Sequence, residues 1–595
     1  MTLRSAALLA LSTLVGLAGC STAEAPPPPT ADAATRVETS TAVLDGYVDD
    51  RGAHVWLGIP YAKPPVGPLR WRAPLPPEPE AGVRDATRFG AACPQIASPL
   101  GGAPEAFYGE LWGDEDCLFL NVYAPAGERS DLPVLVWVHG GGNTIGHSGF
   151  YDGTPLAAAH DVIVVTVNYR LGPLGWLHHP SLAGDSAADA SGNYGTLDLV
   201  RALEWVRDEI GAFGGDGNAV TVFGESAGAS NIASLLVSPW AEGLFRGAVL
   251  QSGGTGSVSV AEASHRTDAP EPGVNSSSGE LLLRTLRLDD PACDRACAVA
   301  RADALSLAEQ EAAFRALSTR EVFRLFEGAT DLLGPDSPAI IRDGAVLPEM
   351  PIIEALGTPG AFHPVPVLLG TNRDEPKIFQ AFDPERVTRL AGLPLWAKDE
   401  RLYDLHAEYG ALAWRVRGVD DIARRLHAAD VPVWSYRWDW DEEGSFLFVD
   451  LTQLVGAAHG LEIPFVFGHF DLGPQTPLLF NEENAPGREA LAARMMAYWV
   501  AFARDLDPGT GADGAGPAWA PFDPEAGTSF LRLDTGEGGI AMEHEVLDFA
   551  GFVDRLAGDE RLVSDEERCG VLASSVRFDR RPEAEAVRDR FGCAR

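Results

Sequence analysis

Short apolar segments rich in valine, isoleucine and leucine recur along much of the chain. Their density of β-branched residues is typical of strands that are covered on both faces, as in a parallel sheet. We therefore predict strands at 133–140, 161–170, 219–224, 247–253, 365–372 and 431–438.

Between the second and third of these runs, apolar residues recur at helical spacing instead. They are Leu199, Leu203, Val206, Ile210 and Phe213. The two glycines that follow, Gly214 and Gly215, are expected to end the helix. From about Thr35 to Phe549, strand-like and helix-like patterns alternate in this way. The expected fold class is α/β, with a large, mostly parallel central sheet flanked by helices.

Two stretches look inserted into this alternation. Residues 253–280 are rich in Gly, Ser and Pro, which predicts an exposed loop, and residues 281–330 are helical in character. We expect a lid-like helical insertion that covers one side of a cleft. The main domain is then expected at 36–555, followed by a charged C-terminal extension at 556–595 that ends in a cysteine couple.

The N-terminus has the layout of an export signal. Arg4 precedes an apolar run, residues 6–17, that is too short to span a bilayer comfortably, and "LAGC" follows at 17–20. This resembles the lipobox of bacterial lipoproteins, which predicts a signal peptide at 1–19, lipidation of Cys20 and a Pro-rich tether at 20–35. Ser21 suits delivery to the outer membrane of the cell envelope. The alternative is an ordinary signal peptide with a chance cysteine.

The charge of the chain restricts its partners. The 595 residues include 46 basic and 85 acidic ones, a formal net charge of −39, without a basic cluster. Such a chain repels nucleic acid and anionic membrane surfaces, so a nucleic-acid partner is excluded. Neutral or cationic substrates are mildly favoured.

The remaining six cysteines form three couples that are close in sequence. They are Cys93 and Cys117, Cys293 and Cys297, and Cys569 and Cys593. Six cysteines allow fifteen pairings, so bonding between nearest neighbours is an inference. Disulfides suit an exported protein, and no second Cys or His couple lies close enough to indicate a metal site.

The segment "VTVFGESAGAS" at 220–230 carries the clearest chemical signal. A strand, then Gly-x-Ser-x-Gly, then a run of small residues is the layout of a nucleophile elbow, with Ser226 on a sharp turn at the start of a helix. Gly224 and Gly228 let neighbouring backbone come close. Alone, the five-residue pattern also fits a Gly-rich structural loop; the strand before it favours the elbow.

A second glycine-rich segment, "HGGGN" at 139–143, follows an earlier predicted strand. Three successive glycines leave backbone N–H groups unobstructed, as an oxyanion hole requires, whereas a flexible turn seldom needs three. His139 is expected to brace this loop.

Several motifs together resemble the type-B carboxylesterase family, the group of α/β-hydrolases that includes the cholinesterases. They follow the family's order over about residues 36–550. The motifs are "EDCLFLNVYAP" (115–125), "HGGGN" (139–143), "NYRLGPLGWL" (168–177), "FGGDGNAVTVFGESAG" (213–228), "LQSGG" (250–254) and "GAAHGLEIPFVFG" (456–468).

The resemblance implies a role for individual residues. It implies Ser226 as nucleophile, His459 as base, Glu375 as acid, and the backbone N–H groups of Gly141, Gly142 and Ala227 as oxyanion donors. This order, Ser then Glu then His, is that of α/β-hydrolases. It also supports a Cys93–Cys117 bridge.

Three points bear on this assignment. Asp374, next to Glu375, is a rival acid that only the family alignment disfavours. Pro376 stands where the family usually has Gly and restricts the backbone of Glu375. Asn143 replaces the family's common aromatic residue, which is expected to change the shape and polarity of the substrate gorge.

The function that follows is hydrolysis of small-molecule carboxylic esters through an acyl-enzyme, without a cofactor or metal. Two alternatives stay open. One is a surface-tethered binding or adhesion module of the same fold, and the other is a true lipase that acts at lipid interfaces.

Overall fold

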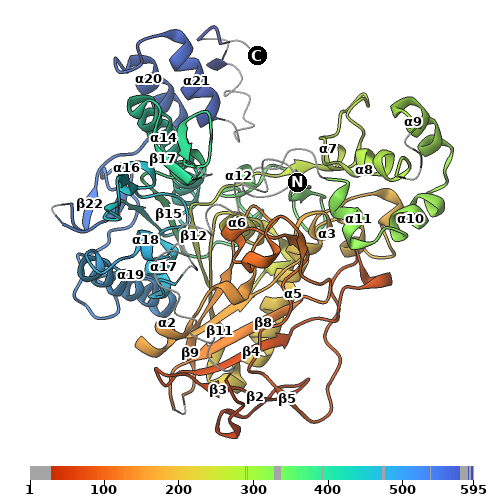
Figure 1. Cartoon of the computed structure of the whole chain (residues 1–595). Coiled ribbons are helices and arrows are strands. Elements are labelled where there is room, and N and C mark those ends of the chain that lie inside the picture. Colours follow the sequence, from red (N-terminus) through yellow and green to blue (C-terminus); the bar gives the residue numbers. More distant parts are fainter. Residues whose placement is uncertain are drawn as a thin grey trace. The chain divides into compact units, whose positions relative to one another are not determined.

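The computed structural model describes residues 29–595 except 128, 289, 291, 327–336, 391–392, 472, 474–475, 537, 577–586, 589–590 and 594–595. The predicted signal peptide at 1–19, Cys20 and most of the predicted tether lie outside the described residues. The described chain forms two compact units, one of residues 29–248 with 255–364 and one of residues 249–254 with 365–595. Figure 1 labels their elements.

The unit of residues 29–248 and 255–364 is built on six neighbouring strands. In spatial order these are β11 (Gly215–Glu225), β9 (Leu132–Val138), β10 (Ile163–Val167), β8 (Phe119–Ala124), β4 (His54–Pro60) and β3 (Tyr47–Val48). β11, β9 and β10 are parallel, with Val136 between Val222 and Val165, whereas the other pairs are antiparallel. Every residue of β9 and β10 is buried, as the apolar runs predicted.

Two helices of this unit follow from the sequence. α5 (Tyr194–Glu209) continues into a 3-10 turn at Ile210–Phe213, and Gly214 ends it in the left-handed region, with φ 91°. α6 (Ala227–Val237) follows β11 directly, and its small residues let it pack closely on the strands. The predicted helix at 199–213 is therefore confirmed.

The predicted exposed loop at 253–280 is wrong in part. β13 (Val258–Ser259) pairs with β14 (Ile341–Arg342), and α7 (Val260–Ser264) follows with a capping box at its start. Val258 and Ala263 are buried against Ile341, so these few apolar residues override the Gly- and Ser-rich composition around them.

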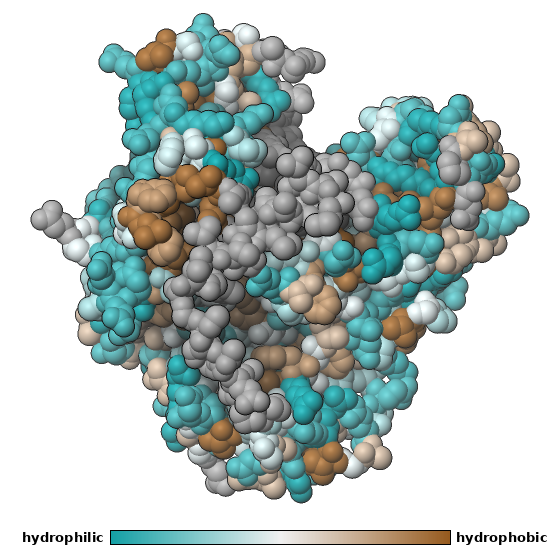
Figure 2. All heavy atoms as spheres, in the orientation of Figure 1, coloured by the Kyte–Doolittle hydropathy of each residue, from teal (hydrophilic) through white to brown (hydrophobic). Residues whose placement is uncertain are grey.

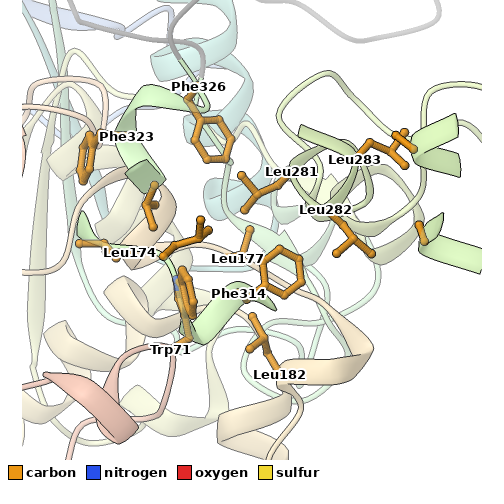
Figure 3. Close-up of a cluster of buried hydrophobic side chains, with 14 of the residues drawn as sticks. Trp71, Leu174, Leu177, Leu182, Leu281, Leu282, Leu283, Phe314, Phe323 and Phe326 are labelled. Atoms are coloured by element: carbon orange, nitrogen blue, oxygen red, sulfur yellow. The ribbon is translucent and has the colours of Figure 1, made fainter. Parts of the chain in front are cut away.

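The helical insertion is confirmed. Its helices are α8 (Ser278–Thr285), α9 (Arg295–Ala304), α10 (Leu307–Arg315) and α11 (Thr319–Arg324). Each begins after a Ser or Asp whose side chain accepts a hydrogen bond from a backbone N–H of the first turn. Leucines of α8 and phenylalanines of α10 and α11 belong to one buried cluster with Trp71 (Figure 3). Whether the insertion covers a cleft stays a prediction.

The other unit has its own strands and helices. β15 (Val367–Asn372), β18 (Val433–Trp438) and β21 (Phe530–Leu533) are parallel neighbours, and β22 (Ala541–Glu543) runs antiparallel to β21. β12 (Gly247–Gln251), β15 and β18 confirm the remaining three predicted strands. The long helices are α14 (Glu400–Arg415), α15 (Asp421–Ala428) and α19 (Ala485–Asp505).

The C-terminal segment is helical. α20 (Phe549–Gly558) and α21 (Asp565–Ser575) pack on α14 through a cluster that includes Leu405, Tyr409, Phe552, Leu556 and Leu572 (Figure 1). Described residues of the predicted extension at 556–595 therefore share a hydrophobic cluster with α14.

The three predicted disulfides are present: Cys93–Cys117, Cys293–Cys297 and Cys569–Cys593. Closing the Cys93–Cys117 loop stabilises the fold by about 3 kcal/mol in the chain-entropy model. Among the described residues, no helix has the length and apolar character needed to cross a membrane.

The face of the molecule drawn in Figure 2 is largely polar, in keeping with the high net charge. Apolar atoms gather where Figure 1 labels α16 (Leu451–Leu454) and β17 (Leu393–Ala397). Five of the fifteen exposed large apolar side chains found in the described residues belong to two hairpins here: Leu390, Trp396, Phe446, Leu447 and Phe448.

Glu443 is a buried acidic residue. Its side chain is buried, and neither carboxyl oxygen has a hydrogen-bond partner among the described residues. Burial, reinforced by the negative charges of Asp441 and Asp374, raises the pKa of Glu443 to about 8. In the folded protein this carboxyl is therefore protonated well above pH 4.5, its ordinary pKa.

We expect Glu443 to make the protein less stable as the pH rises from about 4.5 to about 8. In this window the unfolded chain loses the proton while the folded chain keeps it, so the free energy of unfolding falls by up to about 5 kcal/mol. Glu443→Gln removes this loss. Urea unfolding of both proteins at pH 5 and pH 8 measures it; an equal pH dependence in the two would contradict the prediction.

Candidate active site

Ser226 occupies the turn between β11 and α6. Its backbone has φ 58° and ψ −121°, a positive-φ conformation that costs a residue with a side chain about 1–3 kcal/mol. A Cβ at Gly224 would lie 2.5 Å from the carbonyl oxygen of Val138, and one at Gly228 would clash with the same oxygen. The turn therefore has the strain and the flanking glycines of a nucleophile elbow.

The glycine loop that follows β9 lies against this turn. A Cβ at Gly140 would come within 3.0 Å of the Cβ of Ser226. Gly141 and Gly142 have φ of 93° and 64°, which glycine adopts without strain. Ala227 is the first residue of α6, where backbone N–H groups have no acceptor within the helix. The three expected oxyanion donors thus belong to the same unit as Ser226.

His139 braces this loop, as expected. Its ring is buried, stacks on Tyr169 with centroids 4.5 Å apart, and its Nδ1 lies 2.9 Å from the carbonyl oxygen of Gly140. Burial lowers the pKa of His139 to about 3, so the ring is neutral and serves packing rather than proton transfer.

In the unit of residues 249–254 and 365–595, the buried Glu375 pairs with the partly buried His459. Glu375 Oε2 lies 2.5 Å from His459 Nδ1. The other carboxylate oxygen accepts hydrogen bonds of 2.8 Å from the Thr371 hydroxyl and the Asn372 backbone N–H. The side chain of Trp414 lies against the imidazole, with ring centroids 4.7 Å apart. These contacts fix the orientation of both groups.

The charge of the pair is set by opposing effects. Burial favours the neutral form of Glu375, but the charge and hydrogen bond of His459 outweigh it, and the pKa of Glu375 is lowered. The carboxylate is therefore ionised and can hold one tautomer of the imidazole and stabilise its protonated form.

Asp374, the rival acid, points elsewhere. Its carboxylate accepts hydrogen bonds from the Arg373 guanidinium at 2.7 Å and from the Ala457 backbone N–H at 3.2 Å. Pro376 lies at the turn before α13 (Lys377–Gln380) and does not prevent the contact of Glu375 with His459. The geometry thus favours Glu375 over Asp374.

Sequence analysis did not single out Glu462, which lies behind this pair. Its buried carboxyl accepts hydrogen bonds from Asn372 Nδ2 at 2.6 Å and from Gln251 Nε2 at 3.3 Å. Burial and the charge of Glu375 raise the pKa of Glu462. The signal was an acidic residue within the apolar motif "HGLEIPFVF", three positions after His459.

The structure therefore brings the predicted residues together in two sets. Ser226 lies with Gly141, Gly142 and Ala227 in one unit, and His459 lies with Glu375 in the other. The described residues hold no group of three or more His, Cys, Asp or Glu side chains that could bind a metal ion.

Comparisons with known proteins agree on one family. The sequence model of the "Carboxylesterase family" matches residues 33–392 and 396–549. The para-nitrobenzyl esterase of Bacillus subtilis is 37% identical over 479 residues, 78% of this chain and 88% of that protein. The cocaine esterase of Homo sapiens is 33% identical, covering 87% and 91%. The fumonisin B1 esterase of Sphingopyxis macrogoltabida is 35% identical, covering 78% and 81%.

Solved structures give the same result. A PNB esterase aligns with a TM-score of 0.62 and 32% identity over 85% of this chain and 96% of its own. A carboxylesterase of Geobacillus stearothermophilus aligns with a TM-score of 0.62 and 31% identity, covering 86% and 98%. These likenesses confirm the predicted α/β-hydrolase fold, a large and mostly parallel central sheet with flanking helices.

Proposed function

The chain belongs to the carboxylesterase family and is a serine hydrolase of carboxylic esters, and from this premise we propose that Ser226, His459 and Glu375 carry the reaction. Two sets of residues support the assignment: the strained serine of the elbow beside its glycine loop, and the hydrogen-bonded Glu375–His459 pair. The assignment depends most on the contact of Glu375 with His459, because a serine hydroxyl needs an oriented base before it can attack.

In the proposed mechanism, the oxygen of Ser226 attacks the ester carbonyl while His459 accepts the hydroxyl proton. The tetrahedral oxyanion is held by the N–H groups of Gly141, Gly142 and Ala227. His459 then donates the proton to the leaving alcohol, and the acyl group stays on Ser226. Water, deprotonated by the same imidazole, releases the acid and restores the serine. Glu375 stabilises the imidazolium in both steps.

We propose a small, neutral or cationic ester as the substrate. Relatives are named for esterase activity on para-nitrobenzyl esters, cocaine and fumonisin B1, so the names of the family members do not agree on one alcohol. The net charge of −39 disfavours approach of an anionic ester.

Stopped-flow hydrolysis of a short-chain p-nitrophenyl ester tests the proposed function. We expect a burst of about one p-nitrophenolate per protein followed by slower turnover, because acylation by this activated ester is expected to be faster than hydrolysis of the acyl-enzyme. A non-catalytic binding module would release none. A lipase would instead show a jump in activity above the solubility limit of the ester.

We also propose that the protein is exported and lipid-anchored to the cell envelope through Cys20. The support is the sequence alone: an apolar run at 6–17 that ends in "LAGC", followed by a Pro-rich stretch. The full-length protein is expected in the membrane fraction of a bacterial host and Cys20→Ser in the soluble fraction. Equal distribution of the two would contradict lipidation.

A further inference from the structure

Asn143 directly follows the expected oxyanion glycines, and its side chain is hydrogen-bonded within the protein. Its amide forms a reciprocal pair with the amide of Asn231 on α6: Asn143 Nδ2 donates to Asn231 Oδ1 at 3.2 Å, and Asn231 Nδ2 donates to Asn143 Oδ1 at 2.8 Å. Asn231 is fully buried. Two amides that satisfy each other in this way fix both side chains.

Further contacts hold the same end of the loop. The Tyr169 hydroxyl donates to the carbonyl oxygen of His139 at 2.7 Å and lies 3.2 Å from Asn143 Oδ1. The backbone carbonyl of Asn143 accepts a hydrogen bond of 2.7 Å from Gly172 N–H. Asn143 has φ 60°, a left-handed conformation that Asn tolerates better than most residues. Asparagine at position 143 therefore both tolerates the positive φ and supplies the amide that pairs with Asn231.

The position of this pair relates it to the reaction. The oxyanion donors come from two separate segments, the loop with Gly141 and Gly142 and the start of α6 with Ala227. Asn143 is the residue after Gly142, and Asn231 lies four residues, about one helical turn, after Ala227. The amide pair thus links the two segments directly through side chains. On the loop it lies one residue from Gly142, and on α6 about one turn from Ala227.

We propose that the Asn143–Asn231 pair is a clasp that sets the spacing between the two parts of the oxyanion hole. The proposal rests on the proposed function of Ser226 and its oxyanion donors. Asn143 and Asn231 are positioning residues, because they act through the backbone N–H groups rather than on the substrate. An error of about 1 Å in such an arrangement can cost up to about a hundredfold in rate.

The test compares four variants with the wild-type protein. Asn143→Gly removes the amide but keeps the left-handed backbone free of strain, and Asn231→Ala removes its partner. The double variant carries both changes. Ser234→Ala is the matched control, because it removes a buried hydroxyl from the same helix that donates a hydrogen bond of 3.1 Å to the helix's own Ser230 carbonyl.

For each protein we would measure kcat and KM with a short-chain p-nitrophenyl ester, and the affinity for a trifluoromethyl ketone, which forms a tetrahedral adduct with a serine nucleophile. The clasp predicts that each single variant loses 10- to 100-fold in kcat with KM changed by less than about threefold. The affinity for the ketone falls by a similar factor. The double variant loses no more than the larger single loss, since one bond is broken in each case.

Thermal unfolding of the same proteins separates positioning from folding. The clasp is supported if kcat and ketone affinity fall in variants that are fully folded at the assay temperature, while Ser234→Ala keeps both. It is overturned if the folded variants keep wild-type kcat, if KM rather than kcat changes, or if the single losses multiply in the double variant. A wild-type protein without ester turnover would instead remove the proposed function, and the clasp with it.

Discussion

Replacing Ser226 by alanine is expected to lower kcat for a short-chain p-nitrophenyl ester by about a millionfold, provided that chemistry limits turnover. The variant lacks the hydroxyl oxygen that forms the acyl-enzyme in the proposed mechanism, while the oxyanion loop and the Glu375–His459 pair stay in place. Alanine keeps the Cβ of serine, so the strained turn at φ 58° is expected to stay unchanged.

Ser234→Ala is the matched control for this experiment. It removes the hydroxyl of a serine on α6 that lies eight positions after Ser226. This hydroxyl donates its hydrogen bond within the helix. Wild-type kcat is expected. Turnover of Ser226→Ala at more than about a thousandth of the wild-type rate would mean that another nucleophile carries the reaction.

Replacing Glu375 by glutamine is the second large effect, with an expected loss of about 10⁴-fold in kcat. The amide is neutral and can present N–H₂ to His459 Nδ1, which favours the tautomer that cannot accept the serine proton. It also no longer stabilises the imidazolium. KM is expected to change little, because Glu375 is fully buried and does not touch substrate in the proposed mechanism.

Asp374→Asn is the control that separates the two adjacent acids. Asp374 bonds to Arg373 and the Ala457 backbone rather than to the imidazole, so its loss is expected to cost less than about tenfold in kcat. A larger loss in Asp374→Asn than in Glu375→Gln would reverse the assignment of the acid.

The apolar pattern predicted the strands well because their environment is uniform. β9 and β10 are buried at every position and almost wholly apolar, and β11 is buried and mostly apolar from Ala219 to Phe223, so the signal does not depend on orientation. The same reasoning failed at 258–264, where two buried residues, Val258 and Ala263, are enough to form short elements within a Gly- and Ser-rich stretch.

The site divides in a similar way. The elbow at Ser226 is a local feature of strand, turn and helix, so the sequence was sufficient to find it. The direction of a side chain is not local: Glu375 and Asp374 are neighbours, only the family resemblance chose between them in the sequence, and the fold shows that Glu375 reaches His459. The bond between Asn143 and Asn231 joins residues 88 positions apart, which no pattern in the sequence indicated.

The most direct measurement is the site of covalent labelling by a fluorophosphonate. The probe reacts only with a serine that an oriented base activates, and its phosphonyl oxygen occupies the oxyanion hole. Peptide mapping of the labelled wild-type protein is predicted to find the phosphonyl group on Ser226 in the "VTVFGESAGAS" segment. Labelling of a different serine, or ester turnover without any labelling, would contradict the account.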